Sequence, residues 1–201
     1  MIRNIVFDLG NVLLSFRPAE FLEKKKYPQA LKEQILADVF GSREWLMIDN
    51  GDISTEDAIE AIAGNSLLKR EEIVRIFDLR REILFPLDDN IKVLPELRKR
   101  GYRLYFLSNF PPDIWPEVRK YEFFYHFEGG LISGDAGASK PHRPIYEMLI
   151  TKFGIEPREC LYIDDLEPNV ETAVSLGMKG ITTYGSLKID RMIDEALSES
   201  D

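Results

Sequence analysis

Hydrophobic and polar positions along the chain follow two different periods. Four short apolar runs, each typical of a strand buried on both faces, are separated by segments with helical spacing. The predicted strands are residues 5–7, 103–107, 160–163 and 180–183. Strands that alternate with helices predict an α/β fold with a doubly wound parallel sheet, in which ligands bind outside the carboxyl ends of the strands.

One long segment interrupts this alternation. From about Pro18 to Phe85 the apolar residues keep helical spacing, and no convincing strand lies between them. The pattern therefore predicts an all-helical insertion after the first strand. Further along, the segment between Tyr121 and Ser139 contains several glycines and is expected to be a loop.

Composition limits the possible partners. The 201 residues carry a net charge of -9, which disfavours binding to nucleic acid. No apolar run approaches the roughly 20 residues that cross a bilayer, and the chain runs from Met1 directly into a strand, so we expect a soluble cytoplasmic protein without membrane contact. Cys160 is the only cysteine and excludes an internal disulfide. A monomer and a homodimer remain equally open.

Polar residues follow three of the predicted strands. Asp8 follows the first, Ser108 and Asn109 follow the second, and Asp164 and Asp165 follow the third. Parallel strands bring these ends together, where three carboxylates would repel one another and raise their pKa values unless a divalent cation held them ionised. Ligands that are all oxygen atoms favour Mg²⁺, which also pairs with a substrate phosphate.

Two further features suit phosphoryl transfer. Ser108 and Asn109 offer donors to phosphoryl oxygens, and Lys140 offers a compact positive charge. With Asp8 as a nucleophile and a bound metal, the set meets the needs of that reaction. Structural alternatives stay open: Asp8 can cap a turn in which Gly10 supplies a positive φ, and Lys140 can be a solvent lysine before a proline.

The chain resembles the haloacid dehalogenase (HAD) superfamily over essentially its whole length. The matching segments are Val6-Phe7-Asp8-Leu9-Gly10-Asn11-Val12, Leu107-Ser108-Asn109, Ser139-Lys140-Pro141 with Ile145-Tyr146, and Ile163-Asp164-Asp165 with Pro168-Asn169-Val170. The resemblance implies a Rossmann-like core of residues 1–14 and 88–201 and a helical cap domain of residues 15–87. It is closest to the sugar phosphatases and the phosphatase domain of soluble epoxide hydrolases.

The resemblance also implies roles for the acidic residues. Asp8 would attack phosphorus to form an aspartyl phosphate, which water then hydrolyses. Asp8, the backbone carbonyl of Gly10, and Asp165 would hold Mg²⁺. Asp164 is a further candidate ligand, or orients Lys140 or a metal-bound water.

The phosphate site is implied in the same way. Ser108, Asn109 and Lys140 would bind the transferring phosphoryl group, with Lys140 also catalytic. Asn169 either supports the residues of the site or caps its helix, and the cap is favoured. Trp45, Phe110 and Trp115 are left out of the site, because aromatic residues are more often part of the core. The expected activity is that of a Mg²⁺-dependent phosphomonoesterase for a small phosphorylated metabolite, favouring a sugar phosphate.

One departure from the superfamily pattern leaves alternatives open. Most of its phosphatases carry a second aspartate, as general acid and base, at the position of Gly10. Its absence is compatible with a sugar phosphatase, a hydrolytic 2-haloacid dehalogenase or a catalytically silent binding protein. A receiver domain of a signalling relay fits less well, because there the acidic pair precedes the acceptor. If no other acid acts, less basic leaving groups, as in hexose 1-phosphates, are favoured.

Overall fold

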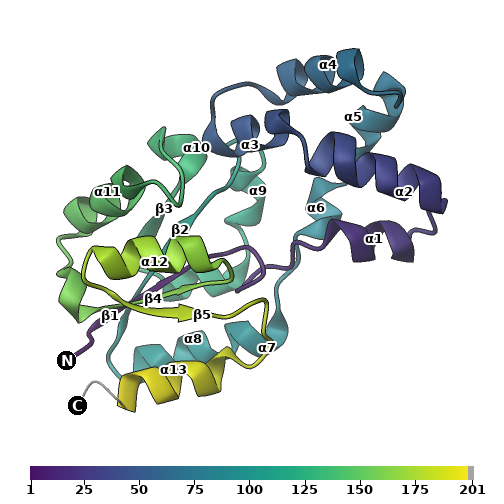
Figure 1. The fold of residues 1–201 in the computed structure, drawn as a ribbon. Coiled ribbons are helices and arrows are strands. Elements are labelled where there is room, and N and C mark those ends of the chain that lie inside the picture. The colour runs from purple at the N-terminus through teal and green to yellow at the C-terminus, as the bar shows by residue number, and fades with distance from the viewer. Residues whose placement is uncertain (199–201) are drawn as a thin grey trace.

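The computed structural model describes residues 1–198 and contains one five-stranded parallel sheet. The strand order is β3-β2-β1-β4-β5, and every adjacent pair is parallel (Figure 1). The predicted α/β fold is therefore confirmed. The strands are β1 (Asn4–Phe7), β2 (Arg103–Ser108), β3 (Gly129–Ile132), β4 (Cys160–Asp164) and β5 (Lys179–Thr182).

Helices cover both faces of the sheet (Figure 1). Side chains alternate along β1, so that Ile5 and Phe7 pack toward α8 and α13 while Val6 packs toward α11 and α12. We call the sheet with these helices the core. Its helices are α7 (Asp88–Ile91), α8 (Val93–Lys99), α9 (Trp115–Val118), η2 (Glu122–His126), α10 (Ser133–Ala136), α11 (Arg143–Phe153), η3 (Pro157–Glu159), α12 (Glu167–Ser175) and α13 (Ile189–Ser198).

The strand β3 corrects the sequence prediction, which placed a glycine-rich loop there. Both glycines are needed because aromatic rings cover the strand. A Cβ on Gly130 would lie 2.4 Å from the ring of Phe106, and one on Gly129 would lie 2.7 Å from the ring of Phe153. Glycine normally weakens a strand, so this edge strand has no sequence signal of its own.

The helical insertion packs as a separate unit beside the core (Figure 1). Its own hydrophobic cluster includes Leu22, Trp45, Ile59 and Phe77. The two connections to the core run side by side, with Ser15 N donating to Phe85 O at 2.8 Å and Leu87 N to Leu13 O at 2.9 Å. The helices are α1 (Pro18–Lys24), α2 (Gln29–Ile35), η1 (Leu36–Phe40), α3 (Arg43–Asn50), α4 (Thr55–Asn65), α5 (Arg70–Asp78) and α6 (Arg80–Ile83).

Ser15 and Leu87 both take part in this pairing, and the division of the chain at residues 15 and 87 stays a prediction. None of the helices within residues 1–198 is long and apolar enough to span a membrane.

Candidate active site

Parallel pairing brings the predicted polar residues to one edge of the sheet. Phe7 of β1 lies opposite Phe106 of β2 and Ile163 of β4, so the residues that follow these positions are neighbours. Asp8 N continues the ladder by donating to Ile163 O at 2.8 Å. Ser108 ends β2 and is 2% exposed. Buried strands therefore present Asp8, Ser108 and the acidic pair together.

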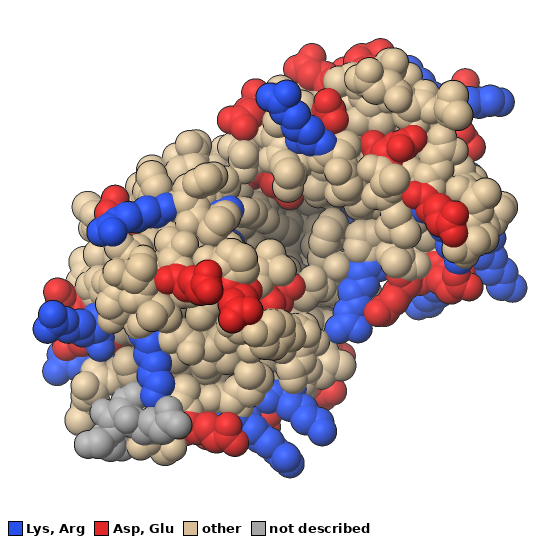
Figure 2. Space-filling model, in the orientation of Figure 1, with Lys and Arg blue, Asp and Glu red and all other residues tan. Residues whose placement is uncertain are grey.

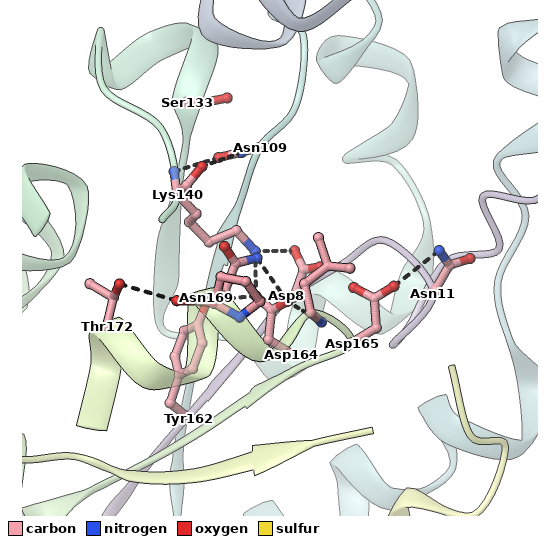
Figure 3. Close-up of polar contacts among 12 residues, drawn as sticks. Asp8, Asn11, Asn109, Ser133, Lys140, Tyr162, Asp164, Asp165, Asn169 and Thr172 are labelled. Atoms are coloured by element: carbon pink, nitrogen blue, oxygen red, sulfur yellow. Dashed lines mark hydrogen bonds and ion pairs between the residues drawn. The ribbon is translucent and has the colours of Figure 1, made fainter. Parts of the chain in front are cut away.

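Lys140 reaches this edge from the loop between α10 and α11. Its Nζ lies 2.7 Å from Asp8 Oδ1 and 2.7 Å from Asp164 Oδ2 (Figure 3). The side chain of Asn109 fixes the backbone of Lys140, donating from Nδ2 to its carbonyl at 2.9 Å and accepting from its N–H at 2.8 Å. Lys140 is 5% exposed, which excludes a solvent lysine.

Asp164 is enclosed by hydrogen-bond donors. Its Oδ2 accepts from the Tyr162 hydroxyl at 2.7 Å as well as from Lys140, and its Oδ1 accepts from Leu166 N at 3.0 Å and Asn169 Nδ2 at 2.9 Å. The expectation that Asn169 caps a helix is wrong, because it lies inside α12 and its amide turns back to Asp164. Both oxygens of Asp164 are thus used to position other groups.

Asp165 is less constrained than Asp164. It is half-buried, and its Oδ2 accepts from Asn11 Nδ2 at 3.2 Å (Figure 3). One carboxylate oxygen from each of Asp8, Asp164 and Asp165 lies within 4.8 Å of the other two. A cluster of oxygen donors at this spacing fits Mg²⁺, and Asp8 and Asp165 suit direct coordination better than Asp164, whose oxygens already accept four hydrogen bonds.

The electrostatics of the cluster also favour a cation. Burial, reinforced by Asp164 and Asp165 and opposed by Lys140, raises the pKa of Asp8 to about 7. Burial and Asp164 raise the pKa of Asp165. Burial opposes the charge of Lys140, but Asp164 and Asp8 outweigh it and raise the lysine pKa above its ordinary value. One ammonium therefore does not fully offset three carboxylates, and a bound cation would keep them ionised.

A cavity of about 80 Å³ lies over this edge, between the core and the insertion, where the surface is hollowed (Figure 2). Gly10, Ser108 and Asn109 line it from the core side. Residues outside the predicted site complete the lining, and they are Phe16, Trp45, Asp49, Arg80, Leu84, Phe110, Pro111 and Ile114.

These lining residues carry no motif that would reveal them in the sequence. Trp45 and Phe110 are predicted to be core residues, and each does pack in a hydrophobic cluster. Both also line the cavity. Trp115 is placed differently, with its ring 5.4 Å from that of Phe106. Which of these aromatic residues line the cavity depends on how the insertion packs against the core, and the sequence does not show this packing.

Comparison with known proteins identifies the family. The profile of the haloacid dehalogenase-like hydrolases matches residues 2–177. The sesquiterpene phosphatase astK of Aspergillus oryzae is 26% identical, over 90% of this chain and 90% of that protein. In two further curated relatives, the segment matched by this chain covers only 36% and 39% of their lengths.

Two solved structures share the fold. A predicted HAD-like hydrolase of Porphyromonas gingivalis has 25% identity and a TM-score of 0.70, with 98% of each chain covered. A HAD family enzyme of Bacteroides thetaiotaomicron, in complex with magnesium and inorganic phosphate, has 25% identity and a TM-score of 0.68, covering 90% of this chain and 94% of that one. The protein therefore belongs to the haloacid dehalogenase-like hydrolase family.

Proposed function

We propose that the protein is a Mg²⁺-dependent phosphomonoesterase that hydrolyses a small phosphorylated metabolite, with a sugar phosphate as the favoured class. The observation that carries this proposal is the placement of Lys140 Nζ between Asp8 and Asp164, at the edge of the sheet where β2 ends with Ser108. A buried cation beside a buried nucleophile suits a dianionic phosphoryl group. The phosphatase astK and the magnesium and phosphate complex of the Bacteroides enzyme support the same reaction class.

Asp8 is the proposed nucleophile. One carboxylate oxygen attacks phosphorus while the leaving oxygen departs, giving an aspartyl phosphate that water then hydrolyses at phosphorus. Lys140 and the hydroxyl of Ser108 bind the phosphoryl oxygens and offset their charge. The amide of Asn109 is occupied by the backbone of Lys140, so its proposed contribution to phosphate binding is through its own backbone N–H.

The acidic cluster is proposed to hold Mg²⁺ through Asp8, the backbone carbonyl of Gly10, and Asp165. Bound there, Mg²⁺ would neutralise charge on the phosphoryl group and keep the nucleophile ionised. Asp164 is assigned to orienting Lys140, because its oxygens accept the lysine, a tyrosine hydroxyl, an amide and a backbone N–H.

Residues 15–87 are proposed to act as a cap. The cavity of about 80 Å³ is smaller than the roughly 300–1,000 Å³ of typical ligand pockets, so a metabolite would enter when the insertion moves away from the core. A closed cap also excludes bulk solvent and polymers. Folded phosphoproteins are accordingly expected to be poor substrates.

A 2-haloacid dehalogenase is the second candidate, because it also forms an ester from its aspartate and needs no acid at Gly10. It has less need of a metal, and hence of Asp165 beside Asp8. Phosphate release from a panel of phosphorylated metabolites with Mg²⁺, compared with chloride release from 2-haloacids, separates the two. Chloride release without phosphate release would overturn the proposed phosphatase.

The variant Asp165→Asn is expected to weaken Mg²⁺ binding, since an amide lacks the charge that a hard cation prefers. Activity should recover at higher Mg²⁺, with the activation constant raised by on the order of 100-fold or more, because loss of a residue that merely supports a metal ligand already costs about 10–100-fold. A titration of activity against Mg²⁺ measures it. Asp135→Asn, at an exposed carboxylate outside the cluster, serves as the control and should leave the constant unchanged.

A further inference from the structure

The space beside Asp8, into which a side chain at Gly10 would point, is open. Among residues 1–198, and apart from its chain neighbours Leu9 and Asn11, a Cβ built on Gly10 would meet only Asp8 Oδ2 within 4 Å, at 3.8 Å. Gly10 lines the cavity, and the insertion supplies Asp49 and Arg80 to the same cavity. An ionisable group can therefore reach this space from the insertion even though the core offers none at Gly10.

The position of Asp49 is fixed against the core. It lies near the end of α3, whose last turn stops at Gly51 with a left-handed φ of 77°. The Ser133 hydroxyl donates to Asp49 O and accepts from Phe110 N, the latter at 2.9 Å. A Cβ on Gly51 would lie 2.7 Å from Gly134 O, so the backbone segments around these two glycines are in close contact. These contacts hold Asp49 over the loops that follow β2 and β3.

Asp49 does not form the ion pair that its neighbourhood suggests. The guanidinium of Arg80 pairs with Asp113 instead, at 2.7 Å, and donates to Phe77 O at 2.9 Å. Burial raises the pKa of Asp49 to about 7, with Asp113 adding to the rise and with Arg80 and a hydrogen bond from the Trp45 side chain opposing it. A carboxyl group in this range can both give and take a proton near neutral pH.

We propose that Asp49 is the catalytic residue that protonates the leaving oxygen of the substrate, an inference that rests on the proposed phosphatase function. When an oxygen of Asp8 bonds to phosphorus and the bond from phosphorus to the leaving oxygen breaks, the proton of the Asp49 carboxyl passes to that oxygen. The product alcohol leaves, and Asp49 remains as a carboxylate.

The second step restores both residues. Water attacks phosphorus of the aspartyl phosphate, the bond to Asp8 breaks, and Asp49 takes one proton of the water while the remaining hydroxyl stays on the released phosphate. Because the acid belongs to the insertion and the nucleophile to the core, the two meet only when the insertion is closed. Hydrolysis is then confined to the closed form.

The test is the dependence of kcat/KM on the leaving group. Wild type should show a flat dependence from aryl to alkyl and sugar phosphates. Asp49→Asn should lose about 10²–10⁴-fold on alkyl and sugar phosphates but only about threefold on 2,4-dinitrophenyl phosphate, whose leaving group needs no proton. Asp52→Asn, at an exposed carboxylate three residues on, is the matched control and should keep the flat dependence.

Two further variants guard against a merely structural loss. Asp49→Glu keeps a carboxyl group and should retain part of the activity on alkyl phosphates. Gly10→Asp in the Asp49→Asn background should restore part of it, since the space at Gly10 admits a side chain. If Asp49→Asn lost the same factor of kcat/KM on every ester, the role of Asp49 as the acid would be overturned, while the proposed phosphatase function would stand. Failure of wild type to hydrolyse any phosphate ester would overturn the proposed function, and this inference with it.

Discussion

The variant Asp8→Asn is expected to lose turnover almost completely, on the order of 10⁴-fold or more, because an amide is a far poorer nucleophile and metal ligand than a carboxylate. The fold should be retained. Lys140 keeps its contact with Asp164 Oδ2 at 2.7 Å, and the amide matches the carboxylate in shape. Steady-state phosphate release and a circular-dichroism melt measure the two effects.

The control is Asp89→Asn, at an exposed carboxylate in the first turn of α7 that pairs with Lys92. Its activity should equal that of wild type. If Asp8→Asn kept a tenth of the wild-type rate, the assignment of the nucleophile would be wrong.

The variant Lys140→Met is expected to lose both activity and stability. Asp8 and Asp164 are 6% and 0% exposed, and both would lose the cation that pairs with them. Breaking a buried ion pair by removing one partner typically costs about 3–5 kcal/mol. Urea unfolding at pH 8 measures the loss, and Lys120→Met, whose lysine makes an exposed pair with Glu117, should leave the stability almost unchanged.

The loss of stability in Lys140→Met should shrink as the pH falls. Burial already raises the pKa of Asp8 to about 7 even with Lys140 present. A carboxyl group whose pKa is higher in the folded than in the unfolded state stabilises the fold increasingly as the pH drops toward its pKa in the unfolded chain. Removal of Lys140 raises the folded-state pKa further, so the variant gains more from this effect than wild type does. The difference from wild type is therefore expected to be smaller at pH 5 than at pH 8. An equal difference at both values would show that Lys140 does not counterbalance these carboxylates.

The sequence predicted the parallel sheet and the cluster at its edge because both depend on local patterns. Apolar runs that end on Asp8, Ser108 and Asp164 indicate the buried strands, and the polar residue at the end of each run indicates the edge of the sheet where the site lies. By contrast, β3 escaped prediction because its glycines make room for the rings of Phe106 and Phe153, which are remote in sequence.

The parts of the site that come from the insertion could not be predicted in the same way. Asp49 lies in an ordinary amphipathic helix, and its relation to Gly10 arises only from the docking of α3 through Ser133. Asn169 likewise looked like a helix cap, because the pattern cannot show that its amide turns back to Asp164. Contacts between segments far apart in the chain decide both cases.

Trapping the covalent intermediate tests the central claim most directly. Wild-type protein turning over its best phosphate ester with Mg²⁺ is quenched, treated with borohydride to reduce any acyl phosphate to an alcohol, and mapped by peptide mass spectrometry. We expect reduction at Asp8 alone, and no reduced peptide from Asp8→Asn. Reduction at another carboxylate, with Asp8 unmodified during active turnover, would contradict the account.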